Sequence, residues 1–135
     1  MLGKESIEQI KLFQICSFIP ECKFMFAVPN GGSRNKIEAY NLKRQGLKSG
    51  VPDILACING YFVGIEVKAP NGKPSDLQIY NVNVINRRGG YAVILYPKDF
   101  GLFKQLTNCL NNHDKKGARK LVHIINNEER RNKVG

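Results

Sequence analysis

The sequence predicts an α/β fold in which helices flank a mixed β-sheet. Segments with apolar residues at helical spacing alternate with short apolar or aromatic runs typical of strands. Two of these runs are separated by Asn59-Gly60, a strong signal for a tight hairpin. The 135 residues, 42% of them hydrophobic, suffice for one compact domain with one core. No apolar run is long enough to span a membrane, and the polar N-terminus lacks the hydrophobic region of a signal peptide, so a cytoplasmic location is expected.

The N-terminal part of the chain is predicted to form a helix, a strand and a second helix. Apolar residues at helical spacing, among them Ile7 and Ile10, predict the first helix, and Pro20 ends it. The apolar, aromatic run that follows is typical of a strand and leads into a turn cluster that begins at Pro29. The second helix ends near Gly46. These elements are expected over residues 5–18, 23–28 and 35–45.

The two strands joined by Asn59-Gly60 are followed by a helix, a strand and another helix. Ser75 is suited to cap the first of these helices, and Asp76 is favourable in its first turn because of the helix dipole. The basic and glycine residues 87–90 end that helix, and the next strand is apolar throughout. We expect strands over residues 52–58, 61–68 and 91–96, and helices over residues 76–86 and 99–110.

The chain is strongly basic. Lys+Arg 21 against Asp+Glu 11 give a net charge of +10, which attracts polyanions, and nucleic acid is the commonest polyanionic partner of a soluble protein. A basic surface without a partner is the alternative. We divide the chain into a domain of residues 1–112 and a basic C-terminal extension of residues 113–135 with a net charge of +4. The extension is expected to clamp DNA, to pack as a terminal helix or to contact a second copy.

Asp53, Glu66 and Lys68 are charged residues within segments that otherwise resemble buried strands. With Asn59-Gly60 as the loop, the numbers of paired residues sum to 119, so Asp53 and Glu66 lie opposite each other, with Cβ atoms ~5 Å apart. The two-residue period of a strand places Glu66 and Lys68 on one face. Converging buried carboxylates are costly unless a cation lies between them, so a divalent metal site is predicted. The alternative is a cross-strand salt bridge on a solvated face.

These residue types suit the hydrolysis of phosphodiester bonds. Carboxylates are hard oxygen donors suited to Mg²⁺ or Mn²⁺, and the backbone carbonyl of Val67 is a candidate third ligand. Such an ion stabilises the negative charge that develops on the phosphoryl oxygens. Lys68 would then orient the attacking water or help to deprotonate it.

The residues that precede Asp53 form a candidate DNA-contacting region. The Asn30-Gly31-Gly32 segment is either a simple turn or a loop whose backbone closely approaches DNA or the metal. A basic helix and loop follow it and lead to Asp53, so their cations should contact phosphates. The candidate DNA-binding residues are Asn30, Gly31, Arg34, Lys36, Arg44, Lys48 and Lys73.

Four motifs over residues 5–97 resemble a known family in their order and spacing. The chain is similar to the VRR-NUC (virus-type replication-repair nuclease) branch of the PD-(D/E)xK nuclease superfamily. The resemblance implies a restriction-endonuclease-like fold with an α-β-β-β-α-β core, and Mg²⁺- or Mn²⁺-dependent cleavage of DNA. The matching motifs are Pro29-Asn30-Gly31-Gly32, Gly50-Val51-Pro52-Asp53, Glu66-Val67-Lys68 and Gln78.

The resemblance also implies roles for single residues. It assigns Asp53 and Glu66 to metal binding and Lys68 to catalysis. Gln78 matches a position near the active site, and we include it among the catalytic candidates. A glutamate of the first helix reaches the site in this family, and Glu5 fits that position better than its alternative, Glu8.

Small stand-alone members of this family resemble junction-resolving enzymes and tend to come from viruses or mobile elements. We therefore expect an endonuclease selective for branched or junction DNA that acts in DNA repair or recombination, in a bacterial or virus-infected cell. A homodimer would place one site on each of two strands. The alternative is a nucleic-acid-binding module that kept the fold and lost catalysis. No nucleotide cofactor is expected, because the sequence has no Gly-x-x-x-x-Gly-Lys-Ser/Thr loop.

Overall fold

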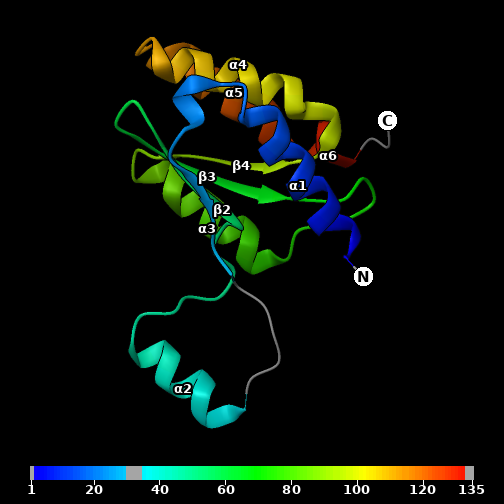
Figure 1. Cartoon of the computed structure of the whole chain (residues 1–135), viewed down its shortest axis with the longest axis vertical. Coiled ribbons are helices and arrows are strands. Elements are labelled where there is room, and N and C mark those ends of the chain that lie inside the picture. The colour runs from blue at the N-terminus through cyan, green and yellow to red at the C-terminus, as the bar shows by residue number, and fades with distance from the viewer. Residues whose placement is uncertain (1, 30–34, 133–135) are drawn as a thin grey trace.

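The computed structural model describes residues 2–29 and 35–132 (Figure 1). Each helix and strand expected from the sequence is present, with bounds within two residues of those expected. Short 3₁₀ turns, η1 (Pro20–Cys22) and η2 (Pro97–Asp99), precede β1 and α4. The strands are β1 (Met25–Ala27), β2 (Ile54–Ile58), β3 (Tyr61–Val67) and β4 (Tyr91–Leu95); the helices are α1 (Lys4–Cys16), α2 (Lys36–Arg44), α3 (Asp76–Arg87), α4 (Phe100–Asn111), α5 (Lys115–Asn126) and α6 (Glu128–Asn132).

The sheet is mixed, with strand order β1-β2-β3-β4. β1 and β3 are antiparallel to β2, whereas β4 is parallel to β3, to which α3 connects it. The β2–β3 turn has φ of 51° at Asn59 and 89° at Gly60, the backbone that favours Asn-Gly in tight hairpins. Tyr61 pairs with Ile58, and the ladder continues in the predicted register to the pair Ile54 and Ile65. The hairpin and its register are confirmed.

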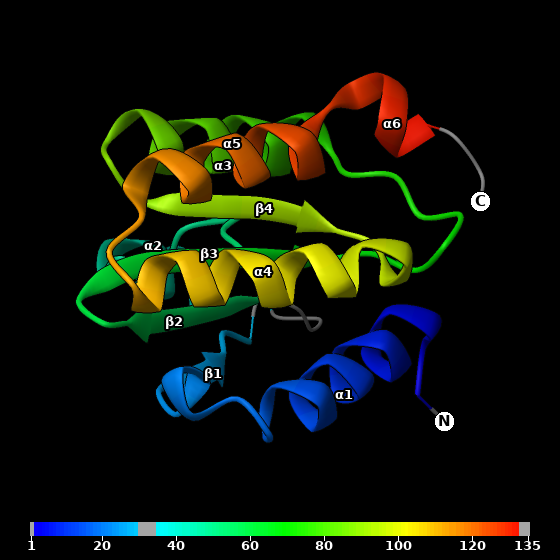
Figure 2. The ribbon, with the colours of Figure 1, turned by 90° about the horizontal axis from the view of Figure 1, so that it is seen from above.

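Helices cover both faces of the sheet, as Figure 2 shows. The odd-numbered residues of β3 and β4 form the main core with α1, α4 and α5, around side chains such as Phe103 and Leu12 that are fully buried. On the opposite face, Ala92 and Ile94 of β4 form a smaller core with Val82 of α3. The period of two along each strand therefore divides the protein into a thick layer and a thin layer.

The basic extension contributes to the core. Ala118, Val122 and Ile125 of α5 are buried in the main cluster. Asn126 binds the outer edge of β4: its Oδ1 accepts from the Ile94 N–H at 2.9 Å, and its Nδ2 donates to the Ala92 carbonyl at 2.9 Å. Of the three roles considered for the extension, packing as a helix is therefore observed for α5. The boundary between residues 112 and 113 stays a prediction.

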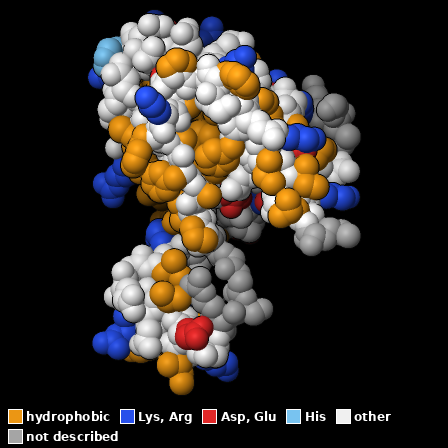
Figure 3. All heavy atoms as spheres, viewed as in Figure 1, with side chains coloured by type: hydrophobic (Ala, Val, Ile, Leu, Met, Phe, Trp, Pro, Cys, Tyr) orange, Lys and Arg blue, Asp and Glu red, His pale blue; other side chains and the backbone are white. Residues whose placement is uncertain are grey.

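Helix α2 differs from the others because it projects from the body, on the side of the sheet opposite α4 (Figure 1). None of its residues is buried, and Ile37 and Tyr40 are largely exposed. Figure 3 shows hydrophobic side chains exposed both on this helix and on the body. None of the helices in the described part of the chain is both long and apolar enough to cross a membrane.

Candidate functional site

The candidate site lies where β2 begins and β3 ends. Asp53 directly precedes β2, Glu66 is the penultimate residue of β3, and Lys68 follows that strand. The hairpin register places Asp53 opposite Glu66, because the paired numbers sum to 119 throughout the ladder. Both the register and the convergence of these residues were predicted from the sequence.

The segment before Asp53 is fitted closely against α3. Gly50 has φ of 75°, and a Cβ placed there would lie 2.6 Å from Leu77 Cγ. The adjacent Ser49 carbonyl accepts a hydrogen bond from Asn81 Nδ2 at 3.0 Å. Only glycine has both the conformation and the absence of a side chain that this approach requires. The Gly50-Val51-Pro52 motif thus fixes the path of the chain into Asp53.

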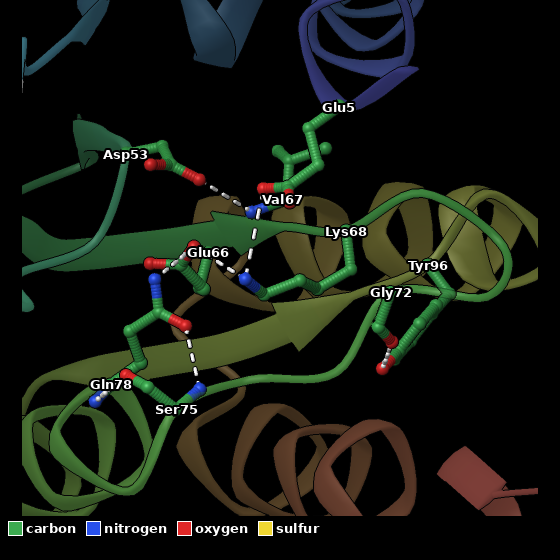
Figure 4. Close-up of polar contacts among 9 residues, drawn as sticks. All are labelled: Glu5, Asp53, Glu66, Val67, Lys68, Gly72, Ser75, Gln78 and Tyr96. Atoms are coloured by element: carbon green, nitrogen blue, oxygen red, sulfur yellow. Dashed lines mark hydrogen bonds and ion pairs between the residues drawn. The ribbon is translucent and has the colours of Figure 1, made fainter. Parts of the chain in front are cut away.

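Three carboxylates converge at the site. Ligand oxygens of Glu5, Asp53 and Glu66 all lie within 4.8 Å of one another. Asp53 Oδ2 accepts from the backbone N–H of Val67 at 3.2 Å, and Glu66 Oε2 accepts from Gln78 Nε2 at 3.1 Å (Figure 4). These bonds hold one oxygen of each carboxylate and leave the other to bind a further group.

Lys68 lies beside these carboxylates and is only 4% exposed. Its Nζ is 3.6 Å from Glu66 Oε2 and 3.7 Å from Glu5 Oε1. Burial of this cation and of Glu66, which is 1% exposed, excludes the alternative of a salt bridge on a solvated sheet face. The ammonium is held at the edge of the acidic cluster.

Glu66 carries the clearest sign of a missing cation. Its Oε1 is buried and has no hydrogen-bond partner among the described residues. Burial, then the hydrogen bond and the charge of Asp53, raise the pKa of Glu66 to about 9, against the opposing charge of Lys68. Without a further cation, a proton therefore stays on Glu66 at neutral pH. A divalent ion that prefers carboxylate oxygens, such as Mg²⁺ or Mn²⁺, fits this set of donors.

Glu5 of α1, rather than Glu8, reaches the site. Glu8 is buried and forms an ion pair with Lys11 on its own helix, at 3.2 Å. The use of the Val67 carbonyl as a ligand stays a prediction. Its N–H donates to Asp53, which connects the two carboxylate-bearing segments directly.

Gln78 has a structural role that the sequence analysis missed. It forms a capping box with Ser75: Gln78 N–H donates to Ser75 Oγ at 3.1 Å, and Ser75 N–H donates to Gln78 Oε1 at 2.9 Å. The remaining Gln78 amide group donates to Glu66. One side chain therefore starts α3 and orients Glu66. The Ser-x-x-Gln spacing is the sequence signal that predicts such a box.

The candidate DNA-binding residues are only partly placed. Lys36 and Arg44 lie on α2, and Lys48 and Lys73 are exposed in loops. Asn30, Gly31 and Arg34, like the rest of the Asn30-Gly31-Gly32 segment, lie outside the described residues. Contact of any of these residues with DNA stays a prediction.

A solved structure described as a VRR_NUC domain protein shares this architecture. The similarity covers 78% of this chain and 89% of the other, with a TM-score of 0.62 and 22% sequence identity. This chain has the VRR-NUC fold. No protein-family model matches the sequence. No curated protein matches it either.

The structural similarity confirms the fold implied by the sequence motifs, a mixed sheet flanked by helices. At 22% identity it establishes the fold alone. The chemistry is therefore inferred from the site itself: three converging carboxylates, one orphaned oxygen and one buried ammonium.

Proposed function

We propose that this protein is a divalent-metal-dependent DNA endonuclease selective for branched or junction DNA. The observation that carries the proposal is the buried, unpartnered Oε1 of Glu66, which lies within a cluster of three carboxylates beside Lys68. Buried polar atoms are rarely left unpaired, and a divalent cation would satisfy this one. The VRR-NUC fold agrees with a nuclease function.

The residues of the site have distinct roles in this proposal. Asp53, Glu66 and Glu5 would hold the ion, and the Val67 carbonyl would add a ligand. A bound Mg²⁺ or Mn²⁺ supplies positive charge for the phosphoryl oxygens and lowers the pKa of a bound water. Lys68, held by Glu66 and Glu5, orients the attacking water and stabilises negative charge near it.

Gln78 is a positioning residue in this scheme. Its amide holds Glu66 Oε2, so that Oε1 faces the acidic cluster. Because Gln78 is also fixed by its capping box, its orientation is set by the start of α3. The first turn of α3 thereby determines where a ligand oxygen lies.

The partner proposed is duplex or branched DNA. A net charge of +10 supports binding to a polyanion, with Lys36, Arg44, Lys48 and Lys73 as phosphate contacts. We propose that two copies act together in repair or recombination, each cutting one strand, in the cytoplasm of a bacterial or virus-infected cell. Two-fold symmetry would match the symmetry of a junction.

The test is a panel of labelled four-way junctions, flaps, nicked duplexes and linear duplexes incubated with Mg²⁺, Mn²⁺ or EDTA. Products are mapped to nucleotide resolution. We expect metal-dependent cuts near the branch point and at least ~100-fold slower cleavage by Lys68→Met. Lys104→Met, at an exposed lysine of α4, is the matched control and should cleave like the parent.

The same panel distinguishes the alternative of a binding module without catalysis. Such a module would bind these DNAs in a salt-sensitive way and yield no metal-dependent product. Equal cleavage by the parent and Lys68→Met would instead disprove the assignment of the site.

A further inference from the structure

The sheet face that carries the site continues into an exposed aromatic surface. Alternation along the strands places Asp53 and Glu66 on the same face as three phenylalanines of β1, β3 and the residue before β1. α3 covers this face over β3 and β4, but the described residues leave it open over β1 and β2. Phe24 is 65%, Phe26 41% and Phe62 49% exposed. We call these three residues the aromatic face.

The register fixes the distance of the aromatic face from the site. The Asp53 carbonyl accepts from the Val28 N–H at 2.7 Å, so Asp53, Glu66 and Val28 lie in one row across the sheet. The next row along the strands contains Phe26, and the row after that contains Phe24 and Phe62. Successive rows on one face are about 7 Å apart, so the aromatic face begins about 7 Å from the carboxylates.

The charges around this face favour a polyanion. Among the described residues, the three rows carry no acidic side chain besides Asp53 and Glu66. A hollow of about 340 Å³ on α3 is lined by Tyr80, Val84, Arg87 and Arg88. Gly90, which follows this helix end, packs close to the Phe62 ring.

A second copy of the chain suits this face less well than DNA. Each copy carries a net charge of +10, so two copies meeting here would bring like charges together around an apolar centre. Nucleic acid offers flat bases for the rings and phosphates for the cations. Helix α2, which carries Lys36, Lys43 and Arg44, also projects on this side of the sheet (Figures 1 and 3).

We propose that the aromatic face binds unpaired nucleobases of a DNA strand next to the cleavage site. Exposed aromatic side chains on a sheet stack with bases regardless of sequence, because every base has a π-face. The preferred substrate class is then DNA with a single-stranded segment at the cut, such as a flap, fork or gap. The inference rests on the proposed function for the placement of the cut, but base binding itself requires no cleavage.

The test measures binding of a short dye-labelled oligothymidine by fluorescence anisotropy in EDTA, where metal-dependent cleavage is absent. The double variant Phe24→Ala/Phe26→Ala should bind at least about tenfold more weakly than the parent. Phe26→Tyr, which keeps a ring, should bind like the parent. Phe18→Ala is the matched control, because Phe18 is 87% exposed but lies beside α1 and α4 on the other side of the sheet.

An abasic oligonucleotide separates base contacts from phosphate contacts, because it keeps the charge and lacks the bases. The parent should bind it about as weakly as the double variant binds oligothymidine, and the double variant should bind both oligonucleotides equally. Equal binding of oligothymidine by the parent and the double variant overturns the proposal. Equal binding of both oligonucleotides by the parent also overturns it.

Analytical ultracentrifugation tests a second copy as the occupant of this face. We expect the parent and the double variant to have the same mass in solution. A parent dimer that Phe24→Ala/Phe26→Ala converts to a monomer would show that a second copy covers the face, and the proposal would be wrong. A protein that binds bases in EDTA but never cleaves DNA would contradict the proposed function and leave this inference standing.

Discussion

Replacing Glu66 with glutamine tests the electrostatics of the site without DNA. Glu66→Gln has nearly the same shape as the protonated glutamic acid and cannot ionise. In the metal-free protein the pKa of Glu66 is raised from 4.5 to about 9, so the folded state holds a proton that the unfolded chain releases above pH 4.5. The free energy of unfolding of the parent therefore decreases as the pH rises from 4.5 towards 9.

The magnitude follows from the pKa values. At pH 7 the unfolded Glu66 is 2.5 pH units above its pKa of 4.5, while the folded group is still protonated. At ~1.4 kcal/mol per unit, the parent loses about 3 kcal/mol of stability between pH 4.5 and pH 7 that Glu66→Gln retains. The stability difference between variant and parent should widen by that amount.

Urea denaturation followed by circular dichroism, in EDTA at several pH values, measures this difference. Glu129→Gln, at an exposed glutamate of α6, is the matched control and should follow the parent. Addition of Mg²⁺ or Mn²⁺ should stabilise the parent, by about 2.7 kcal/mol at a concentration of 100 times Kd, and should stabilise Glu66→Gln much less. Parallel pH curves for parent and variant would refute the reasoning, because Glu66 would then be ionised in the metal-free fold.

Three further substitutions test the supports of the site. Gly50→Ala should lower the free energy of unfolding by about 1–3 kcal/mol and slow cleavage, since its Cβ would meet Leu77 Cγ at 2.6 Å; normal stability in urea would contradict this. Gln78→Ala should cost about 1 kcal/mol through the lost capping box and weaken Mn²⁺ binding measured by calorimetry, whereas unchanged metal affinity would show that Gln78 does not orient Glu66. Phe103→Ala should cost about 3–5 kcal/mol in thermal or urea unfolding because Phe103 is fully buried, and a loss below 1 kcal/mol would place it outside the core.

Local interactions made much of the fold predictable. The Asn59-Gly60 turn fixes the β2–β3 register through its own backbone, so the meeting of Asp53 and Glu66 needed no knowledge of the rest of the chain. The elements were found for the same reason, since caps and periodicity act within a few residues.

Features that depend on distant parts of the chain were less predictable. The choice between Glu5 and Glu8 depends on how α1 packs against β3, and both residues lie on the same helix. The role of Asn126 at the edge of β4 joins residues 32 positions apart. The open face beside β1 was also missed, because Phe24 and Phe26 resemble core residues until the position of α3 is known. Tertiary contacts decide each of these features.

The central claim is that the carboxylate cluster holds a divalent ion required for DNA cleavage. The most direct measurement is the rate at which the parent and Asp53→Asn cut a labelled branched DNA as Mn²⁺ is titrated from zero. The account predicts no cleavage in EDTA, a rate for the parent that rises with Mn²⁺ and saturates, and at least ~100-fold slower cleavage by Asp53→Asn at every concentration. Cleavage by the parent in EDTA, or equal rates for the two proteins, would contradict it.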